Sequence, residues 1–244
     1  MRLALGLSIV FGIITTVVVI QSAADNSDQL GAAGVPRAII EGAGGFFACF
    51  GLLSRFLGLG ALSIAALSVD ADYRSGFIRL LSQAQPRKGV LFSAKAAAIA
   101  IVVAIMTVIA SFVTFMAAGP IAGSSDFSLD TWKTGAVQQA LGGVGRLFLA
   151  TLAWASIGLL IATITKSAGA AIGIGVGWLL LLEPLVTQAS KDIGTYLPGG
   201  TISALAQAGP AAISRSTALV LTCIYLIAAT IAAWIIRSRR DITD

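Results

Sequence analysis

The chain has 244 residues, of which 57% are hydrophobic and only 11% are charged, and its mean hydropathy is +0.93. This composition excludes an ordinary soluble globular protein and predicts an integral membrane protein. The absence of histidine removes the commonest metal ligand and the commonest general base. The net charge of +5 comes from short basic segments between apolar stretches, which indicates membrane topology rather than a nucleic-acid partner.

Six apolar stretches are long enough to cross a bilayer, whose hydrocarbon core of about 30 Å needs about 20 helical residues. They cover residues 3–20, 42–69, 90–118, 142–165, 168–185 and 217–236. We therefore predict an all-α integral membrane protein with six transmembrane helices, forming one transmembrane domain over residues 1–244. Six spans place both termini on the same side of the membrane.

The first stretch has a second interpretation. It follows Arg2 and precedes the small-residue sequence Gln-Ser-Ala-Ala, a pattern that cleaved secretory signals also show. Cleavage would leave five helices and an amino terminus outside the cell. Its apolar core is longer than that of a usual signal, which favours a retained helix.

The basic residues near the ends of the spans predict their orientation. One side of the membrane receives Arg2, Arg74, Arg79, Arg87, Lys88, Lys95, Lys166, Arg237, Arg239 and Arg240. The other side receives Arg37, Lys133, Lys191 and Arg215, interspersed with aspartates. Because cytoplasmic loops are enriched in lysine and arginine, we expect the first side, with both termini, to be cytoplasmic.

The polar run between the second and third stretches, residues 70–88, carries the most specific pattern. Its apolar residues Phe77, Ile78, Leu80 and Leu81 give it one hydrophobic face. A charged segment with such a face predicts a short amphipathic helix at the cytoplasmic membrane surface, between transmembrane helices 2 and 3.

The residues of this run resemble a known motif. Asp72-Tyr-Arg-Ser-Gly76 is followed by Ile78-Arg79, a Pro86-Arg-Lys88 turn and Lys95. This order is similar to the permease subunits of type-two ABC exporters, in which an acidic-Tyr-Arg-x-Gly-Thr-Ile-Arg segment precedes a Pro-Arg-Arg-like turn and a lysine. An outer Leu-Pro-Gly segment before the last helix, at residues 197–200, and an Arg-Arg-Asp ending at residues 239–241 also agree. The chain differs in having Asp72 for glutamate and Phe77 for threonine. Family members usually begin with a cytoplasmic amphipathic helix, whereas the first span here starts almost at Met1, so either this branch lacks that helix or the given chain starts late.

The resemblance implies that the polar run is a coupling helix on which an ABC ATPase subunit docks. The coupling residues would be Asp72, Tyr73, Arg74, Gly76, Phe77, Ile78, Arg79, Leu81, Pro86, Arg87 and Lys88. ATP and magnesium would be bound by that ATPase, because the nearest phosphate-loop-like string here, residues 89–96, lacks the second glycine and the hydroxyl. We expect no catalytic residue, metal or cofactor on this chain.

Apart from Lys95, near the cytoplasmic start of its stretch, three charged residues interrupt the apolar stretches: Arg55, Arg146 and Glu183. Charges inside a membrane are costly and often functional. One interpretation is that Arg146 extends its charge to the interface while Glu183 ends its helix. The other is that Glu183 pairs with Arg146 or Arg55 and closes an outer gate.

The fifth stretch carries Gly169, Gly173 and Gly177 at a spacing of four residues. Such a pattern allows close approach of two helices. The contact can lie within one subunit or between two, and the resemblance favours a subunit interface. Cys49 and Cys223 lie inside apolar stretches, and we assign them no chemistry.

These observations predict a transport subunit rather than an enzyme. It would export an amphipathic or lipid-like substrate, such as a drug, peptide or lipid, across a bacterial cytoplasmic membrane, together with an ATPase and a second permease subunit. That second subunit can be a copy or a paralogue. The alternative is a non-transporting membrane anchor or assembly protein that recruits a cytoplasmic partner.

Overall fold

A computed structural model describes residues 2–25, 35–42, 45–74, 88–125, 127–130, 132, 136–207 and 213–239. Helix accounts for 91% of this part of the chain, and no strand occurs in it. The predicted all-helical architecture is therefore confirmed.

Six helical segments in the described ranges are long and apolar enough to span a membrane. Four of them lie in α1 (Arg2–Asp25), α5 (Lys88–Gly123), α6 (Ala136–Thr165) and α11 (Arg215–Arg239). A fifth, Gly45–Arg74, combines the 3₁₀-helical turn η1 (Gly45–Cys49) with α3 (Phe50–Arg74). The other segment combines α7 (Ala168–Gly177), the π-helical turn η2 (Trp178–Leu182) and α8 (Glu183–Ala189). Shorter elements are α2 (Arg37–Glu41), α9 (Lys191–Tyr196) and α10 (Pro198–Ala206). The prediction of six apolar helices agrees with this structure.

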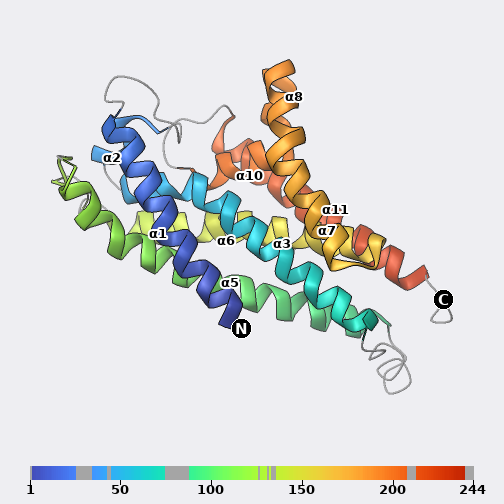
Figure 1. Cartoon of the computed structure of the whole chain (residues 1–244). Helices are drawn as coiled ribbons and strands as arrows, with labels where there is room; N and C mark the ends of the chain where they lie inside the picture. The colour runs from blue at the N-terminus through green and yellow to red at the C-terminus, as the bar shows by residue number, and fades with distance from the viewer. Residues whose placement is uncertain are drawn as a thin grey trace.

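Helix α3 lies at the centre of the bundle. It packs most extensively against α6 and also contacts α1, α7 and α10, while α1 pairs with α5 and α6 with α11. Figure 1 shows α1, α3 and α5 as long rods with similar directions, whereas α7 and α8 diverge from them. The short helix α10 lies beside α3, α6 and α11, in the region that this divergence opens (Figure 1).

Small residues allow α3 and α6 to pack closely. A Cβ atom on Gly158 of α6 would lie 2.6 Å from the carbonyl oxygen of Leu62 on α3. Leu62 and Trp154, which contacts Gly58, are almost completely buried. The α3–α6 pair therefore forms a rigid core between the two ends of the bundle.

The fifth span continues beyond its predicted end near residue 185. Pro184 has no N–H group and would interrupt an ordinary α-helix. The chain avoids this break through the wider turn η2, in which the N–H of Glu183 donates to the carbonyl oxygen of Trp178, five residues earlier. The helix consequently reaches Ala189, and Glu183 lies inside it.

The predicted amphipathic run divides between two helices and a segment that is not described. Asp70, Asp72, Tyr73 and Arg74 continue α3, and Lys88 begins α5. Residues 75–87 lie outside the described part of the chain.

Candidate functional site

Charged side chains meet at the end of the bundle where α3 ends, α5 begins and α11 ends. The Asp72 carboxylate accepts a hydrogen bond from the Lys95 ammonium and lies 3.6 Å from Nη2 of Arg237. All three side chains are largely buried, with exposed fractions of 15–20%. Their ion pairs connect three spans at one point, because each residue comes from a different helix.

Two further contacts extend this group, which we call the Asp72 cluster (Asp70, Asp72, Arg74, Lys95 and Arg237). The Lys95 ammonium donates to the carbonyl oxygen of Ser68 at 2.6 Å. Asp70 and Arg74 form an ion pair of 2.8 Å along α3, with Arg74 mostly exposed. A carboxylate near the carboxyl end of a helix is disfavoured by the helix dipole, so Asp72 depends on the two cations that surround it.

The structure places only some of the predicted coupling residues. Asp72 is in the Asp72 cluster, Tyr73 packs against the buried core, and Arg74 extends toward the surface. Lys88 is the first residue of α5. The remaining predicted residues lie outside the described part of the chain: Gly76, Phe77, Ile78, Arg79, Leu81, Pro86 and Arg87.

At the other end of the bundle, the carboxylate of Glu183 is buried, with an exposed fraction of 7%. The backbone N–H groups of Gly199 and Gly200 donate to its two oxygens, the first at 3.1 Å. These amides open α10, where the first N–H groups have no partner within the helix and the dipole favours a negative charge. Pro198 begins this helix, as proline often does.

Gly199 allows the carboxylate to approach the backbone so closely. A Cβ atom on Gly199 would lie 2.6 Å from Oε1 of Glu183. The Glu183 side chain therefore caps the start of α10 and attaches this helix to the fifth span. The attachment uses backbone N–H groups rather than an ion pair with another side chain.

Arg55 is an exposed residue of α3 that lies near Glu183. Its Nη2 donates to the hydroxyl of Ser203 on α10 at 3.4 Å. Arg55 and Glu183 line the same cavity, which has a volume of about 440 Å³ and is also lined by Thr187 and Gln207. We call this cavity the Glu183 pocket.

Arg146 occupies a different position. It is half-buried on α6 within electrostatic range of Arg215, and its Nη1 lies along its own helix near Gly142. The arginine that accompanies Glu183 is thus Arg55. In the described part of the chain, Glu183 forms no ion pair with either arginine.

The glycines of the fifth span face in two directions. Gly169 and Gly173 are exposed, and a Cβ atom on Gly173 or Gly177 would meet nothing within 4 Å. Gly175 instead packs against Leu62 of α3. The contact between α7 and α3 therefore uses Gly175, and the stripe of Gly169, Gly173 and Gly177 faces away from this helix. Its role in a subunit interface stays a prediction. Cys49 and Cys223 are free.

Sequence reasoning missed the partners that complete both groups. Arg237 was assigned to topology, although its position in the last turn of α11 places it beside Asp72. The sequence places Gly199 and Gly200 in the Leu-Pro-Gly segment, and no side-chain pattern marks an amide that will bind a carboxylate. A Pro-Gly-Gly sequence opening a helix was the available signal.

The Asp72 cluster and the Glu183 pocket both lie inside one region of family similarity. Residues 9–243 match a family model whose description is Protein of unknown function (DUF2705). The chain belongs to the DUF2705 family. No curated protein matches the sequence. The DUF2705 description names no activity, so the function must be inferred from the chain itself.

Proposed function

We propose that this DUF2705 chain is the permease subunit of an ABC exporter. It moves an amphipathic or lipid-like substrate outward, driven by ATP hydrolysis on a separate subunit. It resides in a bacterial cytoplasmic membrane with both termini in the cytoplasm and works as a dimer with a second copy or a paralogue. The resemblance of residues 72–95 to the coupling region of type-two exporters supports this proposal.

The observation that carries the proposal is the Asp72 cluster. Asp72 lies three residues before the 75–87 segment, and its carboxylate is connected to Lys95 on α5 and Arg237 on α11. A displacement of that segment by a closing ATPase would therefore act on α3, α5 and α11 together. Packed elements transmit such motions as rigid bodies.

The Glu183 pocket supports transport at the opposite end. Glu183 connects the fifth span to α10, which itself contacts α3, α6 and α11. In the proposed exporter this connection holds the outer gate closed, and its two amide hydrogen bonds break when the fifth span moves away from α10.

The proposal is tested by purifying the tagged chain from native membranes and identifying what accompanies it. We expect an ATPase subunit to co-purify with the wild type. A variant with Phe77→Ala, Arg79→Glu and Arg87→Glu should lose this partner, because it removes both the apolar face and two charges of the 75–87 segment.

A matched variant controls for the substitutions themselves. Leu185→Ala, Lys191→Glu and Arg215→Glu make the same kinds of change at exposed positions away from the coupling segment, and this protein should retain the ATPase. Absence of any ATPase from the wild-type preparation would contradict the exporter. It would favour the alternative, a non-transporting anchor that recruits another cytoplasmic partner.

The alternative predicts a different response to amphipathic molecules. An anchor has no use for a polar cavity inside its membrane-spanning region, whereas an exporter requires a substrate site. In liposomes containing the complex, substrate should stimulate ATP hydrolysis only if the chain is a permease.

A further inference from the structure

The two charged groups of the Glu183 pocket, Glu183 and Arg55, differ in how many of their hydrogen-bonding positions are occupied. Both oxygens of the buried Glu183 carboxylate accept backbone N–H groups. Arg55 has five N–H donors, and its hydrogen bond in the described structure is the one to Ser203. Because Arg55 is exposed and Glu183 is not, the charge that the pocket presents to a ligand is positive.

The place of Arg55 inside an apolar helical segment makes these donors significant. The segment covers Gly45–Arg74 and is long and apolar enough to span a membrane. A guanidinium in such a segment is costly against hydrocarbon and requires protein, water or an anion as its neighbour. The pocket supplies the space, since about 440 Å³ lies in the range of small-molecule sites.

The walls of the pocket combine polar and apolar groups. Thr187 and Gln207 line it beside Arg55, whereas Leu179 and Pro184 contribute apolar surface. Next to Leu179 and Pro184 on the same span, Leu180 and Leu185 are exposed. An elongated ligand can therefore place a polar group near Arg55 and an apolar group along the fifth span. The π-helical turn η2, which contains Leu179, is a type of distortion found frequently at functional sites.

We propose that the Glu183 pocket binds the anionic head group, a phosphate or a carboxylate, of an amphipathic molecule. Arg55 recognises the anion, with Ser203 fixing the guanidinium, and the apolar part of the ligand lies against η2 and α8. This inference rests on the proposed function, whose substrate class it specifies. Glu183 contributes by holding α10, and thereby Ser203, in position.

The binding test uses the full purified chain without an ATPase. Phosphatidylglycerol and phosphatidylcholine are titrated onto the protein in detergent, and bound lipid is counted by native mass spectrometry. We expect phosphatidylglycerol to bind more tightly. Arg55→Gln should weaken its binding about tenfold, because a hydrogen bond to a charged group is lost, and Arg55→Lys should recover part of the loss.

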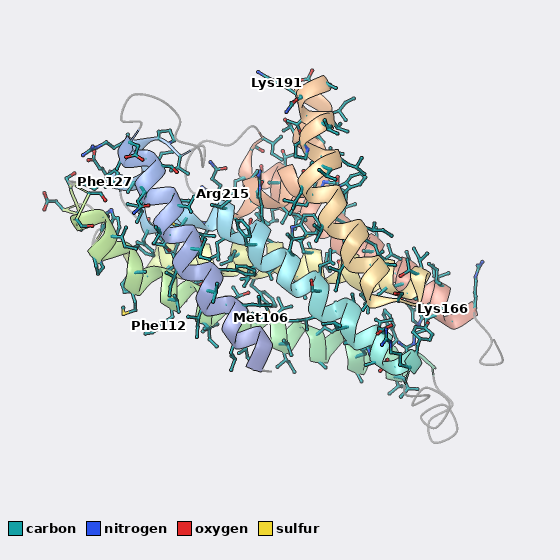
Figure 2. All side chains as sticks on the ribbon, viewed as in Figure 1. Met106, Phe112, Phe127, Lys166, Lys191 and Arg215 are labelled. Carbon is teal, nitrogen blue, oxygen red and sulfur yellow. The ribbon has the colours of Figure 1, made fainter. Side chains whose placement is uncertain are left out.

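A control separates the pocket from general attraction between cations and anionic lipid. Lys191 is an exposed cation on the neighbouring helix α9 (Figure 2), and Lys191→Gln should bind phosphatidylglycerol as the wild type does. Equal binding by Arg55→Gln and the wild type would overturn the proposal. So would equal affinity for the two lipids.

Inorganic phosphate distinguishes a lipid head group from a free anion. We expect phosphate to compete weakly, because it lacks the apolar part. Displacement by phosphate as effective as by phosphatidylglycerol would overturn the amphipathic assignment. Since this assay contains no ATPase, a failed co-purification would refute the exporter without affecting the site, and a failed lipid titration would refute the site without affecting the exporter.

Discussion

The two ends of the bundle stabilise buried charge in different ways. In the Asp72 cluster, one carboxylate is surrounded by side-chain cations from two other spans. In the Glu183 pocket, the carboxylate is held by backbone N–H groups, and the nearby arginine donates to a hydroxyl. In the first arrangement the charged side chains pair with one another, whereas in the second the N–H donors of Arg55 stay accessible. The first is therefore suited to fastening helices and the second to binding a ligand.

The largest effect is expected from Asp72→Asn. The substitution leaves Lys95 and Arg237 close together without a carboxylate, and an uncompensated buried charge is strongly destabilising. We expect the free energy of unfolding to fall by on the order of 3 kcal/mol. Thermal melting in detergent, followed by size-exclusion chromatography, measures the change.

A double variant tests the cause of this loss. Asp72→Asn combined with Lys95→Gln removes one of the two unpaired cations, and it should melt at a higher temperature than Asp72→Asn alone because the two residues interact. If the single variant melted like the wild type, the Asp72 cluster would not be fastening the helices, and the contrast between the two ends would disappear.

The rigid core between the two ends is tested by Gly158→Ala. The new methyl group would lie 2.6 Å from the backbone oxygen of Leu62, so α3 and α6 must separate. We expect a loss of about 1–3 kcal/mol, as for overpacked cores, measured by the same melting assay.

Gly173→Ala is the matched control for the core. This glycine faces open space on α7, and alanine is the better helix former by about 1 kcal/mol. The variant should melt at or above the wild-type temperature. A drop as large as that of Gly158→Ala would show that the Gly169, Gly173 and Gly177 stripe is covered in the protein as purified, as a subunit interface would require.

Glu183→Gln should have a smaller and more local effect. The glutamine side chain has one acceptor oxygen, so one of the N–H groups of Gly199 and Gly200 would face an NH₂ group. We expect a cost of about 2 kcal/mol, concentrated on α10. Hydrogen–deuterium exchange should become faster in peptides covering residues 198–206 and stay unchanged in α3 and α6.

Gln188→Ala, an exposed change on the same helix α8, controls for the position and should leave the exchange of α10 unchanged. For the outer gate, the decisive result is functional. If Glu183→Gln assembled and exported substrate like the wild type, the connection between Glu183 and α10 would not act as a gate.

The sequence predicted the helices more completely than the sites, for a physical reason. Apolar stretches of about 20 residues identify spans by composition alone. The polar run drew attention to Asp72 and Lys95, and these two residues do meet. Arg237, the other cation beside Asp72, lies more than 140 residues from both of them along the chain. Only the packing of the spans brings it to Asp72.

Glu183 shows the other limit of sequence reasoning. Its place inside an apolar stretch marks it as unusual, and the sequence leaves two interpretations open: Glu183 ends its helix, or it pairs with Arg146 or Arg55. The partners that the structure provides are backbone amides at the start of α10, which any residue except proline can supply. The apolar stretch similarly predicts a helix end near residue 185, whereas the π-helical turn η2 lets the helix continue.

The smallest effect on stability is expected from Arg55→Gln. Arg55 is exposed and forms no ion pair in the described part of the chain, so its removal should change the free energy of unfolding by less than about 0.5 kcal/mol. Binding of phosphatidylglycerol should nevertheless weaken. A substitution that abolishes binding while preserving the melting temperature is typical of a site rather than of a structural contact.

The melting temperatures of Arg55→Gln and Asp72→Asn show whether the charges at the two ends of the bundle have different roles. If Arg55→Gln destabilised the protein as much as Asp72→Asn, the guanidinium would be part of the internal framework, and both ends would use their charges to hold helices together. If its melting temperature stayed near that of the wild type while that of Asp72→Asn fell, the charges of the Asp72 cluster would be structural and the guanidinium of Arg55 would be available to a ligand. An accessible guanidinium inside an apolar span is costly without a partner, so the second outcome would leave water or an anion in the pocket as that partner, and the lipid titration decides whether the anion is a head group.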